Sequence, residues 1–304
     1  MKDTVLISEV GPRDGLQNCK GVMPTADKKK WIDGLYTAGL REIEVGSFVP
    51  PKLFPQLADT AQIVAHAKQY DDLTVLALVP NLRGAQGAVD AGVDAITLPL
   101  SVSETHSLKN MRQTHDQVIE TVRGIRKLFD ESAKNIRFEA GLSTAFGCSL
   151  EGVVPEDKVL TLGERLIEAG VDELGLSDTT GYAQPLQVKR LIRRLRETVG
   201  ADKVKSVHLH NTQGLGIANA FSAYEEGIEV FDSSQGGLGG CPASPGASGN
   251  IVTEDLVYMF EAMGVKTGID IDKLMALREI IATALPDEPL YGFTPNAGLP
   301  KSFK

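Results

Sequence analysis

Short runs rich in β-branched and other apolar residues alternate with longer amphipathic segments along nearly the whole 304-residue chain. Such runs are typical of buried strands, and the longer segments have helical spacing of their apolar residues. Eight runs are predicted as strands: 4–10, 42–48, 73–80, 95–101, 136–143, 173–180, 204–210 and 229–234. Strands that alternate with helices pair in parallel, and eight of them close a (β/α)8 barrel. The sequence therefore predicts an α/β protein with a TIM-barrel fold; a doubly wound open sheet is the alternative.

The ends of two predicted helices are visible in the sequence. Thr25 and Pro155 suit helix starts, whereas Gly39 and Gly170 suit helix ends because glycine readily adopts the left-handed backbone that closes a helix. In several of the predicted strand-and-helix units, a short sequence such as AGL, AGV or EGI precedes the next strand. This short sequence predicts a turn from helix to strand.

No linker rich in proline, glycine or serine divides the chain. We therefore predict one domain over residues 1–304, with the barrel in about 4–265. Residues 266–304 are predicted to append a C-terminal helix and tail, in which one helix covers 269–285.

Composition excludes several classes of protein. A net charge of -9 and an isoelectric point near 5.2 argue against a general binder of nucleic acid or of anionic membranes. The three cysteines are odd in number and widely spaced, which argues against a disulfide framework and for a reducing compartment. The start of the chain does not resemble a signal peptide, and no apolar run is long enough to span a bilayer. We expect a cytoplasmic protein.

Polar residues gather where the predicted strands end, and the chemistry of a barrel lies at those ends. Arg13 and Asp14 follow the first strand, and the seventh ends in His208 and His210, whose side chains leave one face of the strand. The remaining candidates are Glu44 and Ser47 at the second strand, Asp178 and Thr179 at the sixth, and Asn250 on the last loop.

Asp14, His208, His210 and Asn250 together offer carboxylate, imidazole and amide ligands to a metal. Nitrogen and oxygen ligands without a thiolate suit Mg²⁺, Mn²⁺ or Co²⁺, and two histidines with one carboxylate also suit Fe²⁺. The alternatives are a hydrogen-bonded histidine pair and, for Asp14, a turn position before glycine. Arg13 could equally form a structural ion pair with an acid at the barrel end.

Cys241 lies in a loop with five glycines and two prolines, GLGGCPASPGASGN. Beside a cationic site its thiol is a candidate proton donor or acceptor; otherwise it is a small apolar filler. Lys20 near the first loop could meet an anionic substrate or remain a solvated lysine. No role is assigned to the other cysteines and histidines.

At these residues the chain resembles the 3-hydroxy-3-methylglutaryl-CoA (HMG-CoA) lyase family, which belongs to the metal-dependent barrel lyases and acyltransferases. The similar phrases are EVGPRDGLQN, SFVPPKLFPQLAD, LSDTTG, HLHNTQGLGIAN and DSSQGGLGGCPASPGASGNIVTEDLVYM. They span nearly the full predicted barrel, and the last one is typical of the lyases rather than the synthases. The resemblance implies a divalent-metal-dependent enzyme that acts on an acyl-CoA.

The resemblance also implies roles for single residues. Asp14, His208, His210 and Asn250 look like the metal ligands, Arg13 like the residue that stabilises the enolate oxygen, and Cys241 like the thiol of a flexible loop. Glu44, Asp178 and Glu254 look like supporting acids, and Lys20 like a lysine near the substrate. His208, or a water held by Asp178, is the hypothesised acceptor of the hydroxyl proton. Paired barrels are common in the family, so a homodimer or higher homo-oligomer is a further expectation.

Three stretches depart from the familiar lyases. The run His210–Gln213 lacks their His-x-His-Asp-Thr continuation, SLEG follows Cys148 where proline and tyrosine are common, and the tail LYGFTPNAGLPKSF differs. These features resemble a bacterial branch that includes lyases of citramalyl-CoA and of longer branched hydroxyglutaryl-CoA substrates. The remaining alternatives are a condensing synthase, which the cysteine and glycine loop and the lack of a long regulatory C-terminal domain disfavour, and a non-catalytic metal-binding barrel.

Overall fold

The computed structural model describes residues 2–132, 134–239 and 249–303, and its strands form a closed parallel barrel in the order β1 to β8. The strands are β1 (Leu6–Glu9), β2 (Glu42–Ser47), β3 (Thr74–Leu78), β4 (Ala95–Ser101), β5 (Arg137–Ser143), β6 (Glu173–Asp178), β7 (Val204–Leu209) and β8 (Val230–Ser233). β1 pairs with β8 through four residue pairs, which closes the barrel. The predicted fold class is confirmed, and the open sheet is excluded.

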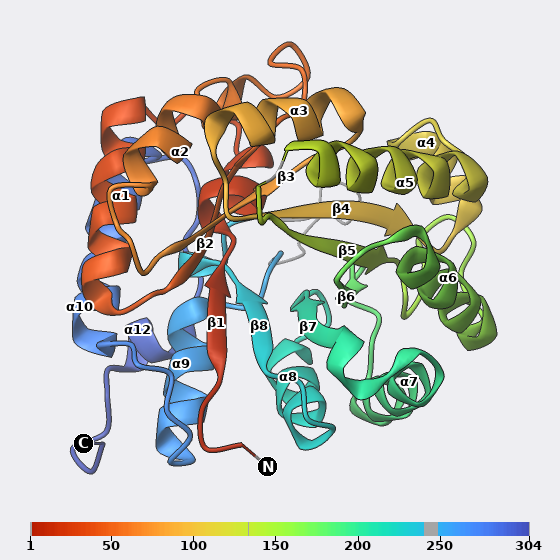
Figure 1. Cartoon of the computed structure of the whole chain (residues 1–304). Coiled ribbons are helices and arrows are strands. Elements are labelled where there is room, and N and C mark those ends of the chain that lie inside the picture. Colours follow the sequence, from red (N-terminus) through yellow and green to blue (C-terminus); the bar gives the residue numbers. More distant parts are fainter. Residues whose placement is uncertain (1, 133, 240–248, 304) are drawn as a thin grey trace.

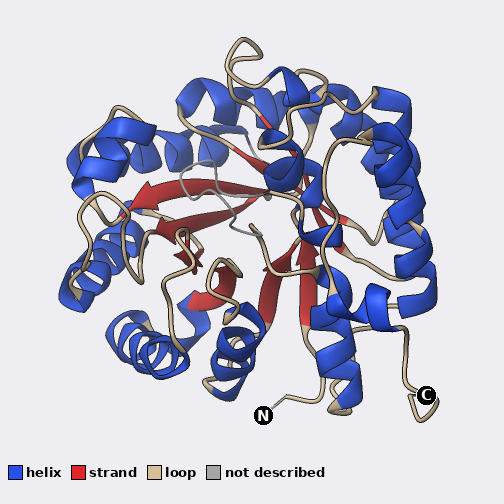
Figure 2. Ribbon diagram, turned by 180° about the vertical axis from the view of Figure 1, so that it is seen from behind, coloured by secondary structure: helices blue, strands red, loops and turns tan. Residues whose placement is uncertain are grey.

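Helices surround the strands on all sides, as Figures 1 and 2 show from opposite directions. Between the strands lie α1 (Thr25–Ala38), α2 (Thr60–Ala67), α3 (Leu82–Ala91), α4 (Glu104–Asn110), α5 (His115–Ser132), α6 (Glu156–Ala169), α7 (Pro185–Val199) and α8 (Gly216–Glu225). After β8 follow α9 (Thr253–Ala262), α10 (Ile271–Ala276), α11 (Arg278–Ala284) and α12 (Phe293–Ala297). The helix ends at Gly39 and Gly170, both with left-handed backbone, are as predicted.

Within the appended C-terminal segment, two short helices, α10 and α11, lie where one helix over 269–285 was predicted. α10 and α11 are separated at Leu277, whose side chain packs against Gly34 of α1; a methyl group on Gly34 would lie 2.3 Å from it. The apolar spacing of the segment does not reveal this break, because the break serves a contact with a helix far away in sequence. The single-domain boundaries stay a prediction.

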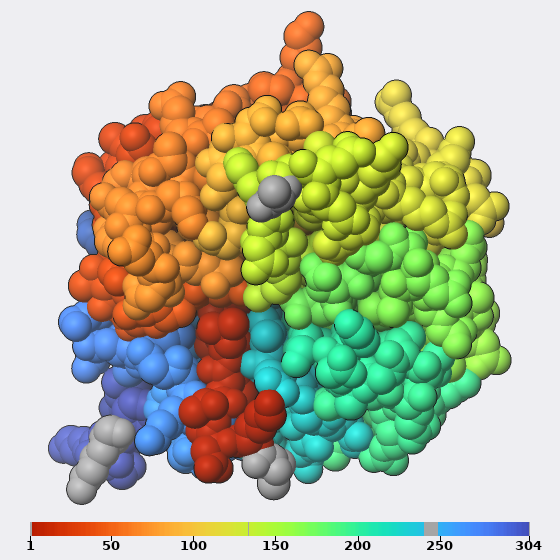
Figure 3. Space-filling model, viewed as in Figure 1, coloured from red at the N-terminus to blue at the C-terminus, as the bar shows by residue number. Residues whose placement is uncertain are grey.

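The core lies between the strands and the ring of helices. Trp31, Phe138, Phe231 and Phe260 are among its largest fully buried side chains. At one end of the barrel the first residues of the chain lie between α9 and the end of α8, red between blue and cyan in Figure 3. There the Tyr224 hydroxyl donates to the Lys2 carbonyl at 2.7 Å. Lys2 therefore lies at the amino end of the strands, opposite the carboxyl end at which barrel sites form.

Candidate active site

A cavity of about 430 Å³ opens within the barrel, and alternate residues of the strands line it. β5 contributes Glu139, Gly141 and Ser143, and β6 contributes Gly175 and Ser177. Alternate residues of a strand leave the same face, so these side chains identify the inward face of the barrel. The same face of β7 carries Ser206 and His208, and His210 follows in register. The two predicted histidines thus lie in the cavity.

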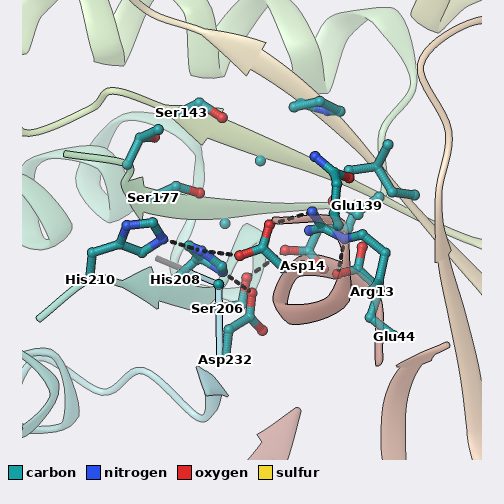
Figure 4. Close-up of a pocket in the computed structure, with 18 of the residues that line it drawn as sticks. Arg13, Asp14, Glu44, Glu139, Ser143, Ser177, Ser206, His208, His210 and Asp232 are labelled. Atoms are coloured by element: carbon teal, nitrogen blue, oxygen red, sulfur yellow. Dashed lines mark hydrogen bonds and ion pairs between the residues drawn. The ribbon is translucent and has the colours of Figure 1, made fainter. Parts of the chain in front are cut away.

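Asp14, His208 and His210 form one cluster, in which a ligand atom of each lies within 4.8 Å of the others. The Nε2 atoms of His208 and His210 are 3.1 Å apart, and Nε2 of His208 is 3.9 Å from Oδ2 of Asp14. Figure 4 shows the three side chains pointing toward one another. The cluster is a possible metal site with nitrogen and oxygen ligands.

A tight turn presents Asp14 to the histidines. Gly11–Gly15 forms a short π-helical turn directly after β1, in which the N–H groups of Arg13, Asp14 and Gly15 all approach the Val10 carbonyl. π-helical turns are rare in proteins, and those that occur are often at functional sites. It directs two consecutive side chains, Arg13 and Asp14, into the same cavity.

Asn250 has a buried amide oxygen without a hydrogen-bond partner among the described residues. Its Nδ2 donates to Oδ2 of Asp14 at 2.7 Å and to the Leu238 carbonyl at 3.2 Å, so the amide orientation is set and Oδ1 remains available. A buried polar atom normally has a partner. The unpaired oxygen beside Asp14 fits a fourth ligand to a hard divalent cation.

The charges of the cluster suit metal binding. Burial raises the pKa of Asp14, but Arg13 and the two imidazoles outweigh it and bring that pKa to about 2. Burial and the neighbouring His208 lower the pKa of His210 to about 4. At neutral pH Asp14 is therefore ionised and His210 neutral, which are the forms that bind a metal.

Arg13 is held rigidly against the barrel wall. Its Nε donates to Oε2 of Glu44 at 2.6 Å and its Nη1 to Oδ1 of Asp14 at 2.5 Å. Burial raises the pKa of Glu44 to about 7, although Arg13 opposes this rise. Nη2 of Arg13 has no hydrogen bond to any described residue, which leaves its two N–H groups available to a bound molecule. Arg13 thus forms the predicted ion pair and also lines the cavity.

Of the other predicted residues, Thr179 lines the cavity, and its hydroxyl accepts a hydrogen bond from the Thr144 N–H at 2.8 Å. Asp178 does not line it, because its two carboxylate oxygens accept the N–H groups of Tyr182 and Ala183 and order the loop after β6. Ser47 lines a separate hollow beside Thr60.

Lys20 and Glu254 are also placed away from the cavity lining. Lys20 is exposed, and its backbone N–H donates to Glu288 at 2.6 Å. Glu254 is fully buried and pairs with Arg278 at 2.8 Å. Cys241 lies outside the described residues, so its predicted role is neither supported nor opposed by the fold.

Sequence reasoning missed Asp232, Glu139 and His106, which all line the cavity. Asp232 and Glu139 are acids inside predicted strands, and their alternation with apolar neighbours was the available signal. His106 follows β4, and its Nδ1 lies 2.8 Å from the Ser101 hydroxyl. His106 lies within α4, and the sequence analysis considered only residues at or directly after the strand ends.

Comparison with known proteins identifies the family. The family model described as HMGL-like matches residues 4–281. The chain belongs to the HMGL-like family. Hydroxymethylglutaryl-CoA lyase YngG of Bacillus subtilis is 41% identical over 95% of this chain and 97% of its own length. The (R)-citramalyl-CoA lyase of Chloroflexus aurantiacus is 39% identical, covering 97% and 95% of the two chains.

Solved structures of HMGL-like proteins agree with the barrel. An HMG-CoA lyase from Acinetobacter baumannii, in complex with coenzyme A and 3-methylmalate, superimposes with a TM-score of 0.92 at 39% identity. The match covers 99% of this chain and 97% of that chain. Among the described helices of the present chain, none combines the length and apolar character needed to cross a membrane.

Proposed function

We propose that this protein is a divalent-metal-dependent lyase that cleaves 3-hydroxy-3-methylglutaryl-CoA, or a closely similar thioester, into acetyl-CoA and acetoacetate or the corresponding keto acid. The observation that supports it most is the cluster of Asp14, His208 and His210 next to the unpaired oxygen of Asn250. The similarity to named lyases over nearly the full chain supports the same reaction. We propose Mg²⁺ or Mn²⁺ as the metal, with Co²⁺ as a further option.

The reaction breaks the bond between C2 and C3 of the substrate. The C3 hydroxyl loses its proton, the electron pair of the broken bond moves to the acetyl-CoA enolate, and C2 then takes up a proton. A divalent cation bound by Asp14, His208, His210 and Asn250 would supply the positive charge that lowers the pKa of the hydroxyl. Arg13 would stabilise the enolate oxygen through the N–H groups of Nη2, and Glu44 holds Arg13 in place.

The contacts of His208 and Asp178 disfavour both hypothesised routes for the hydroxyl proton. Nδ1 of His208 contacts Asp232 and its Nε2 faces His210 in the cluster. Both carboxylate oxygens of Asp178 accept hydrogen bonds from backbone N–H groups. We favour Glu44 instead, directly or through a water. It lines the cavity, its Oε1 has no partner among the described residues, and its pKa of about 7 suits a general base.

Two variants test the proton carriers. Glu44→Gln should lower kcat and remove the acidic limb of the profile of kcat/KM against pH, because the neutral amide cannot accept a proton. Cys241→Ala should lower turnover strongly if Cys241 protonates the enolate, whereas Cys19→Ala, whose thiol pKa burial raises to about 12, should not. Near-normal turnover of either test variant would contradict its assignment.

The function itself is tested with substrates compared side by side. HMG-CoA, citramalyl-CoA and a longer branched hydroxyglutaryl-CoA are each incubated with purified enzyme and Mg²⁺ or Mn²⁺, and acetyl-CoA release is measured. The 39% identity to a citramalyl-CoA lyase makes citramalyl-CoA the second candidate. Failure to release acetyl-CoA from all three would reject the proposal, and condensation from acetyl-CoA instead would indicate a synthase. Light scattering on the same sample tests the expected homodimer or higher homo-oligomer.

A further inference from the structure

Asp232 lies on β8 directly beside His208 of β7. The two residues are register partners on neighbouring parallel strands, and both side chains point into the cavity. Their side chains are mostly buried, with 20% of Asp232 and 15% of His208 exposed. The position is therefore fixed by the hydrogen-bonded ladder of the barrel and does not depend on a loop.

The two ring nitrogens of His208 face different groups. Nδ1 lies 3.1 Å from Oδ2 of Asp232, whereas Nε2 faces His210 at 3.1 Å and Asp14 at 3.9 Å. Figure 4 shows Asp232 below the His208 ring and Asp14 beside it. Only Nε2 can therefore bind a cation in the cluster.

A carboxylate accepts hydrogen bonds and donates none, so the contact with Asp232 requires the His208 proton to be on Nδ1. A neutral imidazole with its proton on Nδ1 has its lone pair on Nε2. Asp232 thereby selects the tautomer in which Nε2 is free to bind a cation, and it fixes the plane of the ring. Carboxylates in this position orient histidine ligands and increase their basicity.

We propose that Asp232 is a positioning residue of the metal site, which holds His208 in its metal-binding tautomer and orientation. This inference rests on the proposed metal site. Asp232 itself is not proposed as a ligand, because its contact is on the ring nitrogen that faces away from the cluster.

The surrounding contacts assign this role to Asp232 and to none of its neighbours. His210 has no such support, since its Nδ1 is buried without a hydrogen-bond partner among the described residues. Glu139, the acid across the barrel, accepts from the Ser206 hydroxyl at 2.6 Å and touches no imidazole. Arg13 donates to Glu44 and Asp14, so the Asp232 carboxylate is not committed to it.

The test measures Mn²⁺ affinity of the purified full-length protein by titration calorimetry at fixed pH. Asp232→Ala should weaken Mn²⁺ binding by about 10- to 100-fold, as removal of such a partner does in other metal sites. Asp232→Asn should lose less, because its amide oxygen can still accept from Nδ1. Excess Mn²⁺ should restore much of the turnover of Asp232→Ala, since the ligands themselves remain.

Glu139→Gln is the matched control, a second buried acid of the cavity exchanged for its amide. Its Mn²⁺ affinity should stay within about threefold of the wild type. Long-range ¹H–¹⁵N spectra of the metal-free protein provide a second readout, in which wild-type His208 carries its proton on Nδ1 and the alanine variant loses this preference. If Asp232→Ala is unstable, Asp232→Leu, which also removes the acceptor but keeps a similar side-chain volume, replaces it and should lose the same preference.

The outcomes separate this inference from the proposed function. If the wild type binds Mn²⁺ and cleaves a thioester but Asp232→Ala binds Mn²⁺ within twofold of it, the role of Asp232 is rejected and the lyase proposal stands. An equal loss in Asp232→Ala and Glu139→Gln would also reject it, because the effect would then be general to the barrel interior. A wild type that binds no divalent cation would reject both.

Discussion

Arg13 combines two roles at the scale of a single residue, because it pairs with Glu44 and also offers a free donor to the cavity. If that donor stabilises charge that develops during the reaction, Arg13→Gln should lower kcat by about 10²- to 10³-fold. Mn²⁺ affinity should change far less. Arg41→Gln, a partly exposed arginine that pairs with Asp72, is the control and should retain turnover. A proportional loss of Mn²⁺ affinity would instead place Arg13 in the metal site.

The raised pKa of buried Glu9 should make the stability of the protein depend on pH. Its oxygens accept the N–H groups of Gly11 and Gln235 and the Thr253 hydroxyl, and burial raises its pKa from 4.5 to about 8. Between these pH values the folded state binds more protons than the unfolded state, so this group makes stability fall as pH rises, by up to about 1.4 kcal/mol per pH unit.

The variant Glu9→Gln removes this titration while keeping an acceptor oxygen. The free energy of unfolding of the variant minus that of the wild type, measured by urea unfolding, should increase from pH 5 to pH 7.5. The exposed Glu164, changed to glutamine, serves as the control and should show no such gain. A stability difference between Glu9→Gln and wild type that is the same at both pH values would show that Glu9 is ionised in the folded protein.

At the scale of elements, the site depends on the segment after β8 meeting the turn after β1. Gly239 has φ of 104°, and a methyl group there would lie 2.7 Å from Nδ2 of Asn250 and 3.2 Å from Gly15. Gly239→Ala should therefore displace Asn250 and lower both Mn²⁺ affinity and turnover.

The variant Gly264→Ala is the control that distinguishes displacement of Asn250 from backbone strain. It also has positive φ, 78°, but a methyl group on it would meet nothing within 4 Å. Both alanine variants should lose about 1–3 kcal/mol of stability from the left-handed backbone. Only Gly239→Ala should lose turnover, as measured by acetyl-CoA release. Equal activity of the two variants would mean that the segment after β8 does not position Asn250.

At the scale of the whole molecule, metal binding should stabilise the barrel, because its ligands come from the turn after β1, from the end of β7 and from the segment before α9. A cation present at 100 times its Kd adds about 2.7 kcal/mol. The Tm should rise by several degrees in Mn²⁺ in a thermal scan. His210→Ala should abolish most of the rise. A rise of equal size in that variant would locate the cation elsewhere.

Much of the fold was predictable because local physics decides it. The alternation of strand and helix patterns identified the eight-stranded barrel, and Gly39 and Gly170 ended their helices because few other residues adopt left-handed backbone. The two-residue period of a strand predicted that His208 and His210 share one face. The rule that barrel sites lie at the strand ends predicted that Asp14 lies near them, as the cluster confirms. Asp178 and Ser47 are also the last residues of strands, yet the Asp178 carboxylate binds N–H groups of the loop after β6 and Ser47 lines a separate hollow.

By itself the sequence determined the barrel, the family and the residue types of the metal cluster, because these follow from periodicity and from chemically distinctive side chains. Only the tertiary structure decided which neighbours those side chains have. The register of β7 against β8 places Asp232 on His208, and a turn after β1 aims Asp14 and Arg13 together. Such pairings join residues far apart in sequence, and a hydrogen bond forms only where the closed barrel brings its two atoms within about 3 Å.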